Sequence, residues 1–146
     1  MRCDGSRETA LSAKTNIIVP AKKDQISVIS EIIKQLMSTS GFSLKEILEM
    51  QLAAEEACTN IALYAYPGTQ GDIHITAEIG DRLILSIEDQ GTPFDPTKCN
   101  APLLQSNADE RPIGGLGIYL IKTCVDEVCY EFRDGKNILR LVKKKA

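Results

Sequence analysis

The sequence has little of what metal centres, disulfide-stapled folds and nucleic-acid-binding proteins require. One histidine, His74, among 146 residues excludes a His-rich metal cluster. The five cysteines are scattered and never spaced Cys-x-x-Cys, so we expect free thiols. The 17 basic and 20 acidic residues leave a formal net charge of -3, which gives no positive field for nucleic-acid phosphates or anionic lipid.

Long apolar runs are missing as well. No stretch approaches the roughly 20 apolar residues of a membrane span, and the first residues lack the apolar centre of a secretory signal. We therefore expect a cytoplasmic protein that binds neither membrane nor nucleic acid directly. With 43% hydrophobic and 25% charged residues, the chain has the composition of one globular domain with its own core.

The first half of the chain predicts a strand followed by a helix. Residues 1–14 are polar and aperiodic and are expected to form a flexible tail. The β-branched run 15–19 predicts a strand, and the single domain is expected to span 15–146. Apolar residues then recur at three- and four-residue spacing from Asp24, the expected N-cap, to the break at Gly41.

The second helix has the clearest start signal. Ser43 and Glu46 have the spacing of a capping box, and Pro67 ends the pattern after Tyr66. At 100° per residue one stripe is expected to face the core: Leu44, Ile47, Ala54, Cys58, Ile61 and Ala65. Glu56 and Asn60 point away from that stripe.

The second half predicts two hairpins separated by a lid and a short helix. Strict alternation over 72–79 continues through Gly80-Asp81 into 83–87, with His74 at a solvent-facing step. A proline-rich connection spans about 92–114. Irregular loops of this length in compact domains are usually functional, so this one predicts a mobile lid. A helix follows, then a last hairpin. This order predicts an α/β two-layer sandwich with the helices on one face of a mixed β-sheet.

Three short motifs carry the candidate chemistry. Glu56 and Asn60 stand four residues apart and stack on one helix face, where an amide oxygen suits Mg²⁺ and a carboxylate can accept a proton. A solvated polar face is the alternative, although Leu52 and Tyr64 share this side. Asp89 ends a strand, with Gly91 allowing close approach of a ligand; an ordinary turn is the alternative.

The third motif is the glycine cluster at the start of the predicted third helix. Gly115-Leu116-Gly117 there offers backbone N–H groups to an anion. It matches neither a P-loop nor a dinucleotide fingerprint.

The order of these motifs resembles the Bergerat-type, or histidine kinase-like (GHKL), ATPase fold. Within that fold the chain is most similar to the anti-sigma factor serine/threonine-protein kinase family. Three strings carry the resemblance, which spans residues 15–143: Glu56-Ala57-Cys58-Thr59-Asn60, Asp89-Gln90-Gly91-Thr92-Pro93-Phe94-Asp95 and Gly115-Leu116-Gly117.

The resemblance implies a role for each motif residue. Glu56 would activate the attacking hydroxyl, and Asn60 would coordinate Mg²⁺. Asp89 would bind the adenine amine, and Gly91 would make room for the ring. The ATP-binding set that it implies is therefore Asn60, Asp89, Gly91, Gly115, Leu116 and Gly117, the last three lining the triphosphate.

Two positions depart from the family's pattern. The family often has Gly-Thr near the adenine, where this chain has Gly135-Lys136-Asn137. Some members place an arginine directly before the Gly-x-Gly; the nearest candidate for such a γ-phosphate contact is Arg111, two residues further away.

The implied function is an ATP- and Mg²⁺-dependent serine/threonine kinase that phosphorylates a STAS-domain antagonist and binds a sigma factor in partner switching. The resemblance also implies a homodimer. Two alternatives stay open. One is a nucleotide-gated protein-binding module without kinase activity, and the other is a stand-alone histidine kinase-like ATPase domain.

Overall fold

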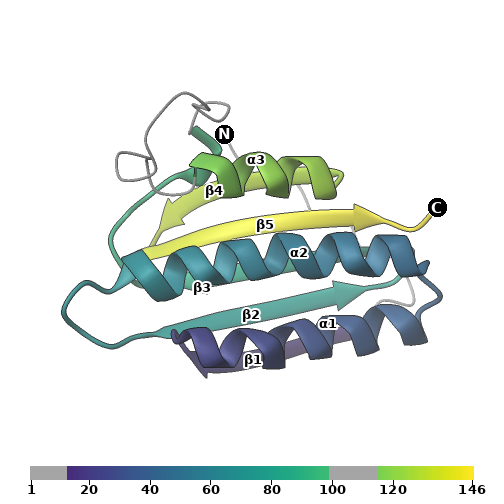
Figure 1. The fold of residues 1–146 in the computed structure, drawn as a ribbon, viewed down its shortest axis with the longest axis horizontal. Coiled ribbons are helices and arrows are strands. Elements are labelled where there is room, and N and C mark those ends of the chain that lie inside the picture. Colours follow the sequence, from purple (N-terminus) through teal and green to yellow (C-terminus); the bar gives the residue numbers. More distant parts are fainter. Residues whose placement is uncertain (1–12, 99–114) are drawn as a thin grey trace.

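The computed structural model describes residues 13–98 and 115–146, which form a β-sheet covered on one face by helices (Figure 1). In these ranges the strands are β1 (Ala13–Pro20), β2 (Asp72–Ile79), β3 (Arg82–Asp89), β4 (Glu127–Arg133) and β5 (Lys136–Lys144). The helices are α1 (Ile26–Thr39), α2 (Leu44–Asn60) and α3 (Gly115–Cys124), with the shorter turns η1 (Lys23–Gln25), η2 (Ile61–Ala65) and η3 (Pro96–Lys98). The expected α/β two-layer sandwich is confirmed.

The sheet differs from the expectation in its strand directions. Its order is β1-β2-β3-β5-β4, and each neighbouring pair in the described part of the chain is antiparallel, so the sheet is not mixed. The helices α1 and α2 run in opposite directions, so together they bring the chain back to the end of the sheet where β1 finishes. β2 starts at that end and therefore runs antiparallel to β1 (Figure 1). The single crossover through α3 makes β4 run parallel to β3, but β5 inserts between them.

The helix starts follow the sequence in one case and differ in the other. The Ser43 Oγ accepts a hydrogen bond from Glu46 N at 3.1 Å, and Ser43 N donates to Glu46 Oε1 at 2.8 Å, which confirms the capping box. Asp24 is not an N-cap. It lies inside η1, which runs directly into α1, so a backbone bond from Ile26 N to Lys23 O replaces the side-chain cap.

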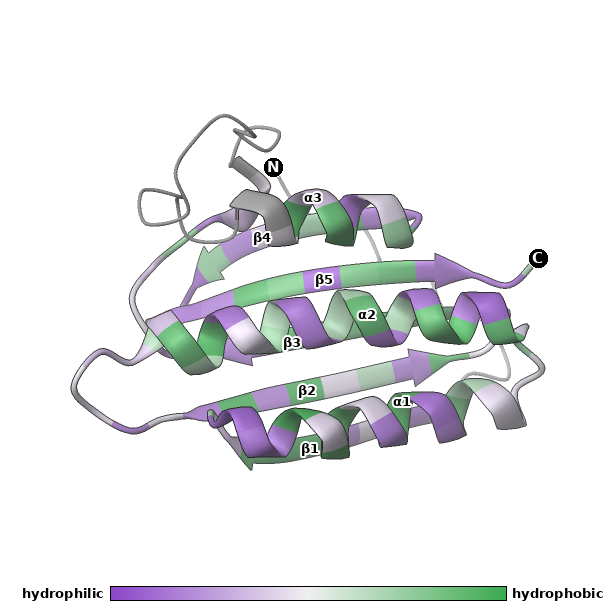
Figure 2. Cartoon of the chain, in the orientation of Figure 1, coloured by the Kyte–Doolittle hydropathy of each residue, from purple (hydrophilic) through white to green (hydrophobic). Residues whose placement is uncertain are grey.

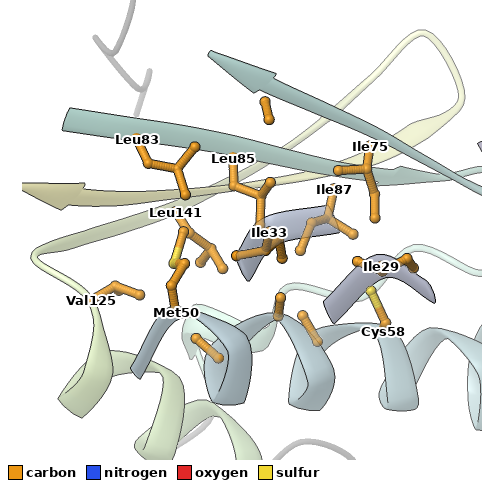
Figure 3. Close-up of a cluster of buried hydrophobic side chains, with 14 of the residues drawn as sticks. Ile29, Ile33, Met50, Cys58, Ile75, Leu83, Leu85, Ile87, Val125 and Leu141 are labelled. Atoms are coloured by element: carbon orange, nitrogen blue, oxygen red, sulfur yellow. The ribbon is translucent and has the colours of Figure 1, made fainter. Parts of the chain in front are cut away.

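The core lies between the sheet and the helices, where inward residues of β2, β3 and β5 meet α1 and α2 (Figure 3). The buried arc of α2 is centred on Met50, Ala54 and Ala57. Leu44 was expected in this arc but is exposed, because it lies about 120° around the helix from Met50. Ile61 and Ala65 are only partly buried, because α2 gives way there to the π-helical η2.

Cross-strand pairing sets the limits of the first strand. Ala13 pairs with Ile79 and Lys14 with Glu78, so β1 begins inside the expected 1–14 tail, and residues 1–12 lie outside the described ranges. The last hairpin turns at Asp134 and Gly135, whose φ values of 55° and 76° are those of the expected tight turn.

The single histidine and the described cysteines can now be placed. His74 lies on the sheet face opposite the helices, as expected, with Nε2 3.2 Å from Asn16 Oδ1. Cys58 and Cys124 are free and buried, and burial raises the pKa of the Cys58 thiol to about 12. Cys129 is disulfide-bonded, which corrects the expectation of thiols throughout. No helix in the described ranges is long and apolar enough to cross a membrane.

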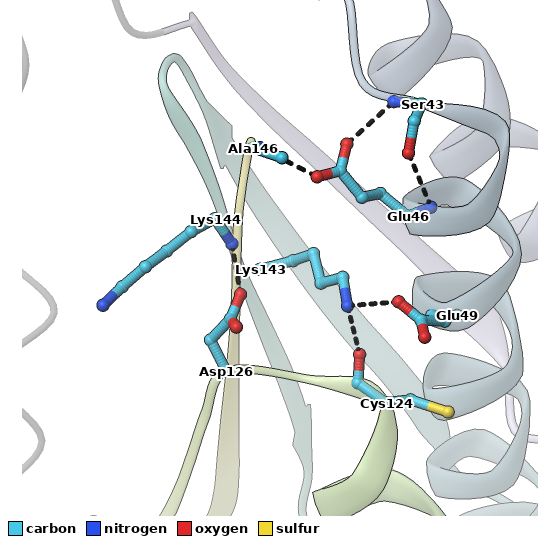
Figure 4. A network of polar contacts seen from close by, with 8 residues as sticks. All are labelled: Ser43, Glu46, Glu49, Cys124, Asp126, Lys143, Lys144 and Ala146. Carbon is cyan, nitrogen blue, oxygen red and sulfur yellow. Dashed lines mark hydrogen bonds and ion pairs between the residues drawn. The ribbon is translucent and has the colours of Figure 1, made fainter.

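Three hydrogen bonds connect the end of β5 and the residues after it to the helices (Figure 4). The buried Lys143 Nζ lies 2.6 Å from both Glu49 Oε1 on α2 and the Cys124 carbonyl at the end of α3. Glu46 Oε2 accepts from Ala146 N at 2.8 Å. The backbone N–H groups of Ser43 and Ala146 both donate to the Glu46 carboxylate, and these two hydrogen bonds hold the pKa of Glu46 below its usual value.

Replacing Glu46 with glutamine is expected to lower the free energy of unfolding at pH 7 by about 1 kcal/mol, because the capping carboxylate is lost. The folded state lowers the pKa of Glu46, so its stabilisation is present above the unfolded value of 4.5 and is lost as the pH falls through the lowered value. Urea denaturation at pH 7 and pH 3 measures both effects. An equal loss at both pH values would contradict the role of the charge.

Candidate functional site

A cavity of about 320 Å³ opens beside the C-terminal end of α2, a size typical of a small-molecule site. Its walls come from the end of α2 with η2, the ends of β3 and β5, the segment 92–96, α3 and β4. Most of the lining is apolar: Ala57, Asn60, Ile61, Tyr64, Ala65, Pro67, Ile87, Asp89, Thr92, Pro93, Phe94, Pro96, Ile121, Tyr130, Asn137 and Leu139. A planar apolar ligand with a few polar edges fits this composition.

Asp89 is the buried carboxylate of this cavity. Within the described residues it accepts two hydrogen bonds, from Gly91 N at 2.8 Å and Asn137 Nδ2 at 3.0 Å, and both end on Oδ1. The Oδ2 atom is therefore left to accept from a ligand amine. Burial raises the pKa of Asp89, while the bonds from Asn137 and Gly91 act in the opposite direction.

Asn137 fixes the surroundings of Asp89 from the neighbouring strand. Besides Asp89, its Nδ2 donates to the Thr92 carbonyl at 3.1 Å, and its Oδ1 accepts from Phe94 N at 3.1 Å and from the Tyr130 hydroxyl. One buried side chain thus ties β3, β4, β5 and the segment after β3 together. The sequence signal for this role is a polar residue on the core face of a strand that continues with Leu139 and Leu141.

Gly91 packs closely against η2. A Cβ at this position would lie 2.2 Å from the Ala65 carbonyl oxygen and 2.6 Å from the Ala65 Cβ. The next residue, Thr92, donates its N–H to the same Ala65 oxygen at 3.0 Å. The close approach of η2 demands glycine here, and room for the adenine ring stays a prediction.

Glu56, Asn60 and Gly117 lie close together, next to the cavity that Asn60 lines. A Cβ on Gly117 would lie 3.3 Å from Glu56 Oε2 and 3.6 Å from Asn60 Nδ2, so a side chain there would enter the space in front of both groups. Glu56 and Asn60 are partly buried, and Asn60 lines the cavity. The stacked pair faces the first turn of α3 rather than open water.

The start of α3 brings backbone N–H groups to the same place. The helix begins at Gly115, as the glycine cluster predicts, and its N-terminal end is favourable for an anion. The side chain of Leu116 and the candidate Arg111 lie outside the described residues, as does most of the expected lid. Its described part comprises 92–95 and η3, where the Thr97 carbonyl accepts from Lys122 on α3.

The donor set fits a nucleotide with one divalent cation. In the described ranges no three His, Cys, Asp or Glu side chains gather as a metal cluster. The site instead offers the amide of Asn60 beside the Glu56 carboxylate. A single amide oxygen suits Mg²⁺, which takes one or two protein oxygens and completes its shell with phosphates and water.

Replacing Asn137 with alanine is expected to lower the free energy of unfolding by about 2–3 kcal/mol, because its partners on β3, on β4 and in the segment after β3 lose their hydrogen bonds. Asn16→Ala is the matched control, since Asn16 is an exposed strand asparagine whose Oδ1 contacts the side chains of His74 and Thr76. Urea denaturation compares the two variants. Similar losses would show that Asn137 is no more than a surface polar group.

Comparison with known proteins agrees with this geometry. The histidine kinase-like ATPase domain family matches residues 19–143. The serine-protein kinase RsbW of Bacillus cereus strain AH187 is 30% identical over 131 residues, covering 86% of this chain and 82% of that protein. RsbW of B. cereus strain ATCC 10987 is 31% identical over 136 residues, with the same coverage of both chains.

A solved structure shares the fold. The crystal structure of the RsbU and RsbW domains of Rv1364c from Mycobacterium tuberculosis superimposes with a TM-score of 0.66 at 14% identity. The match covers 91% of this chain and 32% of that longer chain. The chain therefore belongs to the anti-sigma factor serine/threonine-protein kinase family, with its histidine kinase-like ATPase domain.

Proposed function

We propose that this protein is an ATP- and Mg²⁺-dependent serine/threonine kinase that phosphorylates a STAS-domain antagonist and binds a sigma factor in partner switching. The observation that carries the proposal is that Glu56 and Gly117 lie beside Asn60, which lines the same cavity as the buried Asp89. The relatives named serine-protein kinase RsbW support the reaction class. We also propose a cytoplasmic homodimer that has no direct contact with nucleic acid or membrane.

Asp89 would select adenine. Asp89 is a buried residue that lines an apolar cavity, its Oδ2 accepts no hydrogen bond within the described residues, and an exocyclic amine is the donor that such an acceptor favours. Asn137 holds the other carboxylate oxygen, so the acceptor is already oriented before a ligand arrives. The aromatic side chains of Tyr64, Phe94 and Tyr130 contribute to the walls around it.

Glu56 would accept the proton of the attacking hydroxyl. ATP would supply the phosphoryl group that is transferred, and the bound Mg²⁺ would neutralise negative charge on that group. Asn60, one turn from Glu56, would hold the cation, while Gly117 leaves the space between them free. Backbone N–H groups from Gly115 to Gly117, with Leu116 between, would line the phosphates.

Replacing Glu56 with glutamine is expected to reduce phosphoryl transfer by about 100-fold or more while ATP affinity stays within a few-fold of wild type. The assay follows γ-labelled ATP with purified STAS-domain proteins from the same organism. Glu55→Gln is the matched control, because the Glu55 carboxylate accepts from Ser30 Oγ at 2.7 Å and so faces α1. Tight nucleotide binding by the wild type without transfer would instead indicate the protein-binding module.

Replacing Asp89 with asparagine is expected to weaken ATP binding by about 10- to 100-fold at pH 8, because a charged acceptor is lost. Protonation also removes that acceptor, so wild-type affinity should approach that of the variant as the pH falls through the raised pKa of Asp89. Calorimetric titration of both proteins from pH 8 down to the lowest pH at which both remain folded tests this. A gap that stays constant over that whole range would argue against the carboxylate as the adenine acceptor.

A further inference from the structure

An exposed row of leucines on α2 leads directly to Glu56. Leu44, Leu48 and Leu52 are 70%, 54% and 39% exposed and stand four residues apart, and Glu56 is the next position in the row. Each step of four residues turns about 40° around a helix, so the row winds from the outer surface of α2 toward α3. Apolar residues recur along the whole of α2 in Figure 2.

The neighbouring helix widens this apolar strip. Tyr119 on α3 is 53% exposed. In the chain it stands between Gly117 and Cys124. Gly117 lies beside Glu56. Lys143 donates hydrogen bonds both to the Cys124 carbonyl and to Glu49. Tyr119 therefore lies on the part of α3 that runs alongside α2 between Glu49 and Glu56. We call Leu44, Leu48, Leu52 and Tyr119 the leucine strip.

Nothing in the core requires these side chains. The sheet-facing arc of α2 is filled by Met50, Ala54, Ala57 and their neighbours, and the strip lies on the other side of the helix. Exposing a continuous row of leucine side chains to water is unfavourable, and such a row is typical of a surface that another protein covers.

We propose that the leucine strip docks the phosphoacceptor protein, an inference that rests on the proposed kinase function. The hydroxyl to be phosphorylated must come within hydrogen-bond distance of Glu56, so the folded protein that carries it must cover the adjoining surface of α2. Beyond Glu56 the helix enters the nucleotide cavity at Asn60 and Ile61. Along α2 this leaves the strip as the side of approach.

The chemistry of the partner follows from the strip. The partner presents an apolar surface beside a serine or threonine hydroxyl. The distance between that surface and the hydroxyl matches the distance from Leu52 to Glu56. Leu48 and Leu52 would be covered by it, while the nucleotide would make no contact with them. Docking and nucleotide binding are therefore separable by mutation.

The test compares the double variant Leu48→Glu/Leu52→Glu with Val28→Glu. Val28 is a matched control because it is 44% exposed on α1, away from the strip. Each STAS-domain protein encoded in the same genome is purified, and its Kd is measured by calorimetry with Mg²⁺-ADP, alongside the KM for phosphoryl transfer. The strip variant should raise both by about 10-fold or more, whereas Val28→Glu and the affinity for ATP should change little.

The outcomes separate the strip from the kinase proposal. One outcome is that the wild type binds a STAS protein but does not phosphorylate it, and that the strip variant does not bind it. This result supports docking and overturns the kinase proposal. Unchanged binding and transfer in the strip variant overturn docking alone. If the wild type neither binds nor phosphorylates any STAS protein, both proposals are overturned. A change of oligomeric state in light scattering assigns the strip to a second copy and also overturns it. If the glutamates prevent folding, Leu48→Ser/Leu52→Ser replaces them.

Discussion

The contact between α2 and the first turn of α3 is the constraint on which the site depends. Gly117 has no side chain, so α3 starts within reach of Glu56 and Asn60 and leaves a space in front of them. Lys143 holds the other ends of these two helices together through Glu49 and the Cys124 carbonyl (Figure 4). The distance between the helices is thus fixed at both ends, once by the smallest residue and once by a buried cation.

Features that depend on neighbouring residues could be predicted from the sequence. The capping box of Ser43 and Glu46, the hairpin turns and the stacking of Glu56 on Asn60 each follow from spacing within a few residues. Features that depend on distant partners could not. The directions of β4 and β5 are fixed by where β5 inserts, and the exposure of Leu44 depends on where the sheet meets α2.

The site shows the same division. Glu56, Asp89 and Gly117 stand in recognisable motifs; Gly117 lies beside Glu56 and Asn60, and Asn60 shares a cavity with Asp89. Asn137 stands in no motif, yet it orders the carboxylate and the segment that follows β3. Gly91 does stand in a motif, but the reason for its missing side chain is the passage of Ala65, a contact between residues 26 apart in the chain. Connecting residues of this kind emerge only when the strands are aligned.

The end of α2 has a consequence of its own. The segment η2 is π-helical, and a π-helical turn accommodates more residues than an α-helical turn. This wider turn sets the rotational phase at which Tyr64 reaches the cavity wall and the Ala65 carbonyl meets Thr92. Removing a single residue from it would leave the preceding α-helix intact and yet rotate everything beyond it by about 100°. At this point the number of residues is constrained as strictly as their identity.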